Sequence, residues 1–466
     1  MMISPTRRRA LSSRWRRVLA RLGSISPEAG DALLYGSGAL FALITILTSI
    51  EALYRQWAEL AMAPFIFGAL CSALLALRAR RSNGGEPHIV PPRWVARRTA
   101  IPRIAVALFV FAGATAVPLA LEVLWRSDGD PGSHVQPEVP VIEHAGQSVA
   151  KGKDPYHEVT NTHLKVVYHA PGVSTVNTFV PYLPLMTVFG LPSAKRHDIV
   201  LTDARIFFSL ATLLVSITAL GLLDSNGRRK MRALQVLAIL PTAALPLATG
   251  GDDMPVVAFL LLAMVLAQRR QPFASGVVLG IVSAMKFTAW PLAGLALFAA
   301  RNRQGERRPG LMALGMLVMA GPVVVPFALH GPWAFFDNVI LFPLGLSGVA
   351  SPAASPLPGH LIVTAFPFLH RALPLVVGFV GSALLALRLY RRPPQTVAQV
   401  CTLGGVVMAV ITLLAPATRI GYLLYPINFF VWSYLFSETA ASRRSGLPGM
   451  DERDGLLREL SYSAAA

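Results

Sequence analysis

The chain has 466 residues, of which 54% are hydrophobic and only 14% are charged. Soluble globular proteins carry about 25% charged residues, so this chain has too few to cover a water-facing surface. Apolar stretches of about 18 residues or more recur along most of its length, and each is long enough to cross a bilayer. The composition excludes a soluble enzyme and a disordered scaffold, and it predicts an all-α polytopic membrane protein.

The net charge of +18 comes from basic clusters that lie between the apolar stretches. Positive-inside bias explains this distribution, so we expect membrane lipids and no nucleic acid as partners. The two cysteines, Cys71 and Cys401, both lie within expected spans. Neither a disulfide framework nor a cysteine metal site is therefore expected.

In chain order, we expect about ten full transmembrane helices and one short membrane hairpin. The full spans are 32–50, 60–77, 104–121, 206–223, 233–249, 254–267, 309–329, 372–387, 397–416 and 420–436. The basic N-terminal segment lacks a convincing cleavage site, so we interpret it as a retained tail. With the N-terminus inside, most of the 42 Lys and Arg residues fall on inner segments. This predicts a multi-pass plasma-membrane protein with both termini in the cytoplasm.

Residues 272–300 are apolar and lie between two basic, inner segments. Twenty-nine residues are too few for two crossings of about 20 residues each. A short helical hairpin that turns near Lys286 satisfies both the length and the flanking charges, provided that other helices or a water-filled cavity surround the turn. The alternative is one long tilted helix in which Lys286 snorkels toward the interface.

Two outer segments are long, at 122–205 and 330–371. The first contains VPVIEHAGQSVAKG (139–152), which predicts a surface helix, and FVPYLPLMTVFGLP (179–192), which is too short and too rich in proline to cross. The second has apolar pieces that fit the membrane interface. No internal repeat is visible, which weakens a transporter interpretation.

Lys286 and Arg419 lie in apolar surroundings, and a charge at such a position requires an anionic partner. That partner is either a protein carboxylate or a lipid-linked phosphate reached from the bilayer. Asp252 and Asp253 follow a Gly-Gly turn; Asp253 fits a helix cap, and one of the two aspartates is expected to face Lys286. Asp203 and Arg205 are expected to form a structural pair at a helix start.

The histidines of the first outer segment match no metal-ligand spacing, so no metal site is predicted, although the outer carboxylates leave a divalent ion open. They are His134, His144, His157, His163 and His169. The sequence contains no Walker loop, GxSxG or HExxH motif. A cytosolic nucleotide-dependent mechanism and an organic cofactor are therefore not expected.

Several short motifs occur in a fixed order. PEVPVIEHAGQSVAKGKDPY (137–156) places an acid at Glu138, then Ala145, Gly152 and Asp-Pro-Tyr, and FVPYLP (179–184) follows. TDARIFF, GGDDMPV, LGIVSAMKFTAWP and TRIGYLLYP come later. In this order they resemble the GT-C membrane glycosyltransferases of family 87, the polyprenyl-phosphate-mannose-dependent mannosyltransferases of actinobacterial type.

The resemblance covers about residues 104–436, so we expect a GT-C-like catalytic module there. Residues 32–103 then form two additional transmembrane helices with a basic inner loop, and 1–31 and 437–466 are cytoplasmic tails. The family's first-loop acid is typically Asp, whereas this chain has Glu138. Asp128 and Asp130 therefore compete with Glu138 for the same role.

The resemblance implies transfer of a hexose, mannose in the family, from a polyprenyl-phosphate donor to an extracytoplasmic glycan or lipoglycan. Glu138, Asp128 or Asp130 is expected to be the general base, and Lys286 and Arg419 are expected to hold the donor phosphate.

Asp252 and Asp253 are expected to bind sugar hydroxyls or to position Lys286. Tyr156 and Tyr182 are candidates for stacking on an acceptor sugar, with interface anchoring as the alternative. The main rival function is a membrane transporter or flippase.

Overall fold

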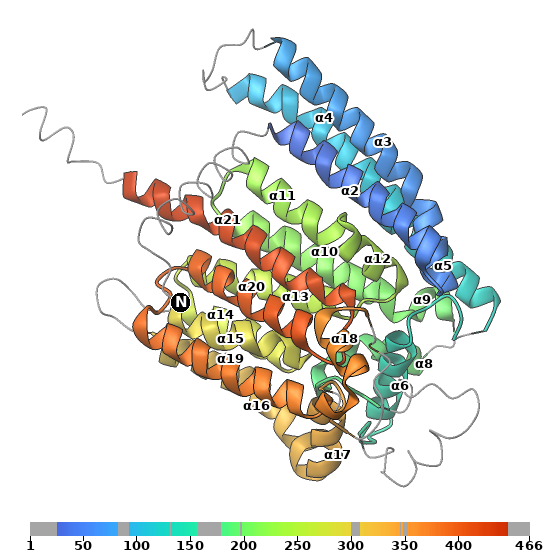
Figure 1. Cartoon of the computed structure of the whole chain (residues 1–466), viewed down its shortest axis with the longest axis vertical. Coiled ribbons are helices and arrows are strands. Elements are labelled where there is room, and N and C mark those ends of the chain that lie inside the picture. The colour runs from blue at the N-terminus through green and yellow to red at the C-terminus, as the bar shows by residue number, and fades with distance from the viewer. Residues whose placement is uncertain are drawn as a thin grey trace, which may run out of the picture. The chain divides into compact units, whose positions relative to one another are not determined.

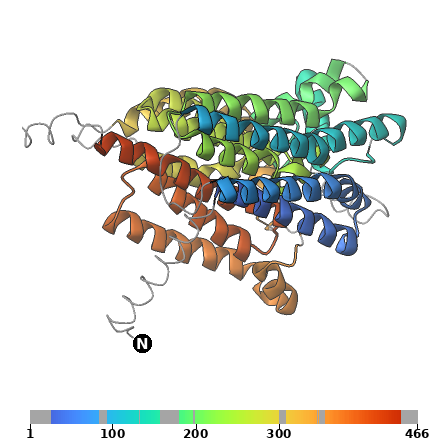
Figure 2. The same cartoon turned by 90° about the horizontal axis from the view of Figure 1, so that it is seen from above.

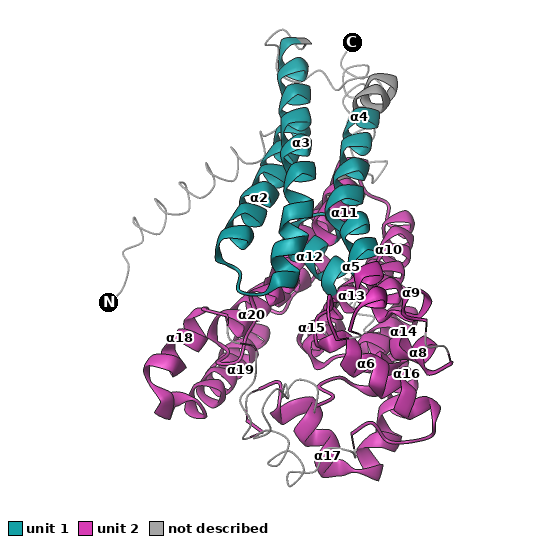
Figure 3. Ribbon diagram, turned by 90° about the vertical axis from the view of Figure 1, so that its right-hand side faces the viewer, with its two compact units in different colours: residues 1–122, 238–249 teal, residues 123–237, 250–466 magenta. Residues whose placement is uncertain are grey.

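A computed structural model describes residues 26–82, 93–130, 132–156, 179–195, 198–299, 308–344, 346–347, 353 and 355–445. The regular secondary structure in these ranges is helical, and none of them contains a β-strand. The expectation of an all-α polytopic membrane protein is confirmed. The chain divides into two compact units, shown in Figure 3: residues 1–122 with 238–249, and residues 123–237 with 250–466.

The first unit contains three long helices that lie side by side at the N-terminal end of the chain (Figure 1, blue). They are α2 (Pro27–Thr48), α3 (Ala52–Ser82) and α4 (Arg93–Phe111). The last of these continues through a π-helical turn, η1 (Ala112–Ala116), into α5 (Val117–Asp128), of which only the part up to Glu122 belongs to this unit. The helix α12 (Pro241–Thr249) completes the unit.

Buried polar contacts join these helices. The buried Arg103 guanidinium lies 2.7 Å from the Asp31 carboxylate, which connects α4 to α2. The Trp57 indole N–H donates to the Ala114 carbonyl at 2.9 Å, within the π-helical turn. A π-helical turn frees carbonyl groups from the regular helical hydrogen bonds. Here the Ala114 carbonyl accepts its hydrogen bond from the Trp57 indole.

The second unit surrounds a central helix, α13 (Asp253–Gln268), which is apolar between its first and last residues and is buried on most of its faces. Such all-round hydrophobicity is typical of a helix with neighbours on every side, and α10 (Ala204–Leu222) and α14 (Pro272–Ser283) both pack against it. Next to α14 lies α16 (Pro309–His330). Near the C-terminal end, α20 (Val397–Leu414) and α21 (Leu424–Ser445) lie side by side, in orange and red in Figure 1 and Figure 2.

The long helix α19 and several shorter helices complete the second unit. They are α6 (Glu138–Ala150), η3 (Pro184–Gly190), α8 (Leu191–Lys195), α9 (Ile199–Thr202), α11 (Gly227–Ala238, which ends at the unit boundary), η4 (Phe287–Ala289), α15 (Trp290–Ala299), α17 (Pro332–Phe336), η5 (Asp337–Leu341), α18 (Pro358–Ala365), η6 (Pro367–Leu369), α19 (Ala372–Arg391) and η7 (Ile420–Leu423). The helix expected over 139–152 is α6, and 179–192 forms only the short η3 and the start of α8.

Within the described residues, seven helices are long and apolar enough to cross a membrane, or eight if a bent pair is one span. This is fewer than the ten full crossings expected from the sequence. The expected span 233–249 falls on the bent pair, which consists of α11 and α12 with a bend of 46° between them. The expected span 254–267 is the 16-residue α13, which is short for a bilayer.

The chain is broken at Lys286, where the sequence predicted a turn. Lys286 has an extended backbone (φ −152°, ψ 136°) between α14 and η4, and α15 follows. The alternative of one continuous tilted helix through 272–300 is therefore wrong. The expected division of the chain at residue 103 stays a prediction; in the structure, α4 and η1 belong to the same unit as α2 and α3.

The Arg103–Asp31 contact generates a stability prediction. Replacing Arg103 with Met leaves the Asp31 carboxylate buried, and loss of one partner of a buried ion pair costs about 3–5 kcal/mol. We expect a lower midpoint of thermal unfolding in detergent for Arg103→Met. The double variant Arg103→Met/Asp31→Leu is expected to recover most of the loss, and a double variant as unstable as the single one would contradict this account.

Candidate active site

Five charged residues that the sequence singled out come together in the second unit. Each lies at an end of a helix or at a break between helices. Glu138 is the first residue of α6, and Asp252 and Asp253 stand at the start of α13. Lys286 is the extended residue before η4, and Arg419 immediately precedes η7. We call these five residues the charged cluster.

Lys286 is paired with both aspartates. Its Nζ lies 2.7 Å from Asp252 Oδ2 and 2.7 Å from Asp253 Oδ1. The Tyr425 hydroxyl donates to Asp253 Oδ1 at 2.6 Å and is hydrogen-bonded to Thr288 Oγ1 at 2.7 Å. The anionic partners of Lys286 are therefore protein carboxylates, which was one of the two alternatives.

The capping role expected for Asp253 is not observed. The helix α13 begins at Asp253 itself, and the N-cap residue is Asp252, whose side chain makes no capping hydrogen bond. Both carboxylates are instead bound to the Lys286 ammonium, since hydrogen bonds between charged groups are stronger than those to neutral donors.

Arg419 is paired with Glu138 through its Nη1 and the carboxylate Oε1. The Arg419 side chain is 29% exposed and the Glu138 side chain is 13% exposed, so this pair is the more accessible part of the charged cluster. Lys286, by contrast, is only 7% exposed. The second carboxylate oxygen of Glu138, Oε2, is buried and makes no hydrogen bond within the described residues.

Two aromatic rings lie beside the Lys286 ammonium. Its Nζ is 5.5 Å from the centre of the Tyr182 ring and 5.8 Å from that of Tyr422, within the range of cation–π attraction. Burial raises the pKa of Tyr182 well above 10, and the carboxylates of Asp252 and Glu138 raise it further. The Tyr182 ring thus lies beside the Lys286 ammonium of the charged cluster.

The charged cluster contains three carboxylates and two cations. Burial raises the pKa of Asp252 to about 7; Lys286 opposes this shift, whereas the nearby Asp253 carboxylate adds to it.

The loop that carries Tyr182 is tied to the break at Lys286. Leu183 N–H donates to the Met285 carbonyl at 3.0 Å, and Leu185 N–H donates to the Ala284 carbonyl at 2.9 Å. The Tyr156 hydroxyl donates to the Tyr182 carbonyl at 2.7 Å. These bonds attach the Tyr182 loop to the two residues that precede Lys286.

Tyr156 is fully buried, with the rings of Phe327 and Phe335 packed edge-on against it at 6.0 and 5.1 Å. A ring in this position has no open face for an acceptor sugar. Its observed contacts support the Tyr182 loop instead. Tyr182 is itself only 2% exposed. Its ring lies inside the protein beside Lys286, and not at a surface.

Asn338 is a further support that the sequence did not reveal. It lies on the π-helical turn η5, its side-chain oxygen accepts from Val180 N–H at 2.8 Å, and its amide donates to the Ala334 carbonyl at 2.8 Å. No motif marks it, because an amide that bonds to a distant backbone group has no local spacing signal.

Asp128 and Asp130 are not brought into the charged cluster. Both are exposed; Asp128 ends α5, and the Asp130 carboxylate accepts from Gly132 N–H at 3.0 Å in a turn. Of the three acids that compete for one role, only Glu138 contacts Arg419 in the described structure.

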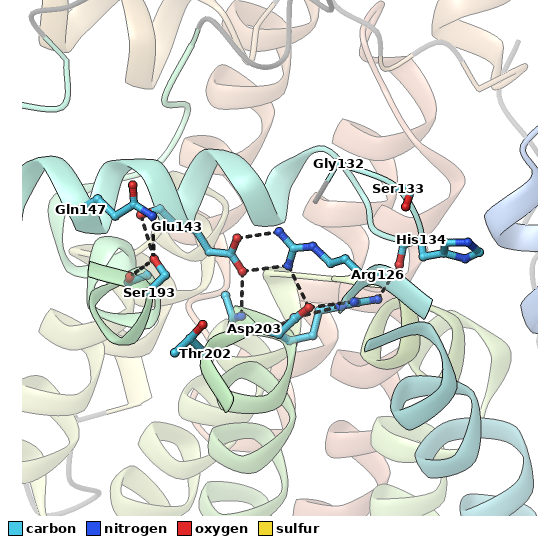
Figure 4. Close-up of polar contacts among 12 residues, drawn as sticks. Arg126, Gly132, Ser133, His134, Glu143, Gln147, Ser193, Thr202 and Asp203 are labelled. Carbon is cyan, nitrogen blue, oxygen red and sulfur yellow. Dashed lines mark hydrogen bonds and ion pairs between the residues drawn. The ribbon is translucent and has the colours of Figure 1, made fainter. Parts of the chain in front are cut away.

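A second buried network lies beside α6. Asp203 and Arg205 form the expected pair, with Asp203 Oδ2 2.8 Å from Arg205 Nη2. Figure 4 shows that Arg126 extends this pair, since its guanidinium lies between Asp203 and Glu143. That Arg126 and Glu143 belong to this network could not be predicted from the sequence, because 17 residues separate them and the intervening turn decides their contact.

No group of three or more His, Cys, Asp or Glu side chains in the described part of the chain is arranged to hold a metal ion. Of the five histidines of the first outer segment, His157, His163 and His169 lie outside the described residues.

The Lys286 pairing predicts a pH-dependent stability. Lys286→Met leaves Asp252 and Asp253 buried together without their cation. The ammonium that opposes the raised pKa of the Asp252 carboxyl is then lost, so this folded-state pKa rises further above the unfolded value of about 4. A raised pKa favours folding at low pH, and this contribution is lost as the pH rises through the folded-state pKa. We therefore expect the variant to unfold at lower temperature than wild type at pH 8, with a smaller deficit at pH 5.

Thermal unfolding in detergent at the two pH values measures this effect. Arg371→Met, at an exposed position before α19, is the control for loss of a cation. A deficit that is the same at both pH values would contradict the pairing.

The sequence comparisons give the chain its family. No curated protein matches it. The model of glycosyltransferase family 87 matches residues 179–416, about half of the chain. This segment includes Tyr182, Asp252, Asp253 and Lys286, whereas Glu138 and Arg419 flank it. The chain therefore belongs to glycosyltransferase family 87, and it is a membrane glycosyltransferase.

Proposed function

We propose that the protein transfers a hexose from a polyprenyl-phosphate donor to a glycan or lipoglycan acceptor on the extracytoplasmic side of the plasma membrane. Mannose is the sugar that the family resemblance suggests. The observation that carries the proposal is the contact of Glu138 with Arg419 at the accessible edge of a buried charged cluster. It offers a proton acceptor and a phosphate ligand at adjacent positions.

The donor chemistry requires little more than these two groups. A polyprenyl phosphate is a good leaving group, so its departure needs cations and no general acid. The acceptor hydroxyl must lose a proton as it attacks, and one carboxylate performs this task. Direct attack in a single displacement inverts the anomeric centre, as in the inverting hydrolases.

Glu138 is the proposed base. Its Oε2 is buried and makes no hydrogen bond within the described residues, so it is available to accept a proton. Its Oε1 is held by Arg419. A donor phosphate competes with Glu138 for the Arg419 guanidinium, which matches phosphate and carboxylate geometry equally well. Donor binding thus shifts positive charge from the base to the leaving group and makes the carboxylate a stronger base.

Lys286 contributes differently from Arg419. Two carboxylates neutralise its charge, and its side chain is only 7% exposed. We propose that Arg419 is the direct phosphate ligand, and that Lys286 fixes Asp252 and Asp253, which bind hydroxyls of the transferred sugar. This arrangement needs no nucleotide, and the lipid tail of the donor remains in the bilayer.

A transporter or flippase is the alternative. It would move a lipid-linked sugar without breaking the bond between sugar and phosphate. Family membership favours the transferase, and the chain lacks the repeated halves that many transporters share.

The test is transfer of labelled sugar from polyprenyl-phosphate mannose in membranes that contain the protein. We expect Glu138→Gln to lower transfer by about 10²–10⁴-fold, because a general base contributes that much. Asp128→Asn, which removes an exposed carboxylate, is the matched control and should transfer at the wild-type rate. Full activity of Glu138→Gln would exclude it as the base, and no labelled product from the wild-type protein would favour the transporter.

A separate prediction concerns the proposed phosphate ligand. Arg419→Ala should lower transfer by about 10²–10³-fold, as loss of one anion-stabilising donor does, while the protein accumulates normally. Arg371→Ala, at an exposed position, is the control. Retention of activity within threefold in Arg419→Ala would contradict the phosphate role.

A further inference from the structure

The charge network beside α6 is more elaborate than a helix start requires. Arg126 lies in the last turn of α5, and its two terminal nitrogens bind the two oxygens of Glu143 at 3.0 and 2.7 Å. The same guanidinium reaches Asp203 at 2.8 Å. Figure 4 shows Glu143 directed from α6 toward Arg126, with Asp203 on the other side of the guanidinium.

Arg205 extends the network to the turn before α6. It binds both oxygens of Asp203, at 2.9 and 2.8 Å, and donates to the His134 carbonyl at 2.7 Å. His134 precedes Glu138 by four residues. The network therefore holds α6 from the side, through Glu143, and holds the turn that enters it, through His134.

Close contacts at two glycines further fix the position of α6. Gly146 lies against Gly190, and a Cβ atom at Gly146 would be 2.4 Å from the Gly190 carbonyl carbon. At the other end, Gly250 has φ +125°, and a Cβ atom there would be 2.4 Å from Val139 Cγ2. Val139 follows Glu138, and Gly250 lies two residues before Asp252. The first turn of α6 is thus packed directly on the loop that carries the aspartates.

We propose that Arg126 and Arg205 are positioning residues, which set Glu138 in register with Arg419 and the aspartates of the charged cluster. This inference rests on the proposed role of Glu138 as the base. Neither arginine touches substrate; both act through α6.

The two arginines are expected to set the geometry of α6 more than its stability. Arg126 and Arg205 are almost completely buried, and the desolvation of buried ion pairs offsets most of their mutual attraction. A planar guanidinium bound at both ends, however, fixes the distance and the angle between the groups that it joins. A displacement of about 1 Å in a catalytic group can lower the rate about 10²-fold, so a fixed α6 matters for the base.

The test uses Arg126→Lys in the full-length protein. Lysine keeps the charge but cannot bind Glu143 at two points and Asp203 at the same time. We expect kcat for sugar transfer to fall tenfold or more, with KM for the donor within twofold of wild type. Arg229→Lys is the matched control, because Arg229 joins α11 to α21 through the Tyr434 carbonyl and the Ser437 hydroxyl and lies outside the network.

A double-variant cycle separates positioning from a general structural role. If Arg126 acts through Glu138, adding Arg126→Lys to Glu138→Gln causes little further loss, because the positioned group is already inactive. Losses that multiply, or an unchanged kcat in Arg126→Lys, would overturn the inference. Full activity of Glu138→Gln alone would instead refute the base assignment, so the two failures are distinguishable.

Glu143→Gln keeps the shape of the side chain but removes its charge, and it is the second variant that tests the positioning role. It should reproduce the same kcat loss and the same lack of additivity with Glu138→Gln. If Arg126→Lys does not accumulate in membranes, Glu143→Gln takes its place. A fall in kcat that is not additive with Glu138→Gln then supports the inference, whereas losses that multiply or an unchanged kcat overturn it.

Discussion

A charge buried away from water requires a partner of opposite charge, and this requirement organises the second unit of the protein. Lys286 is paired with two aspartates and Arg419 with Glu138. Each of these residues lies where a helix starts or breaks, so the ion pairs join chain segments that are distant in sequence. The pairing builds the candidate active site and also fixes the helix ends around it.

The sequence identified most members of this site because charge is rare in the apolar part of the chain. Lys286, Arg419 and the aspartate pair stood out on that ground, and the break at Lys286 followed from the length between basic segments. The pairing of Lys286 with both aspartates was only partly foreseen. Capping was the competing expectation for Asp253, and the strength of a buried ammonium as a partner decided against it.

Other features could not be predicted because they depend on contacts between distant segments. The contact of Glu138 with Arg419 joins residues that are 281 positions apart, and only the fold distinguishes Glu138 from Asp128 and Asp130. Asn338 and Arg126 carry no motif of their own. Tyr156 illustrates the converse: its motif is recognisable, but the structure places its ring in a buried aromatic cluster, where it supports the Tyr182 loop.

An experimental structure of the protein with a non-transferable polyprenyl phosphonate analogue of the donor sugar would test the proposed site most directly. We expect the phosphonate on the Arg419 guanidinium, with Glu138 released from it and Asp252 and Asp253 still on Lys286. A phosphonate bound elsewhere, with the Arg419–Glu138 pair intact, would contradict it.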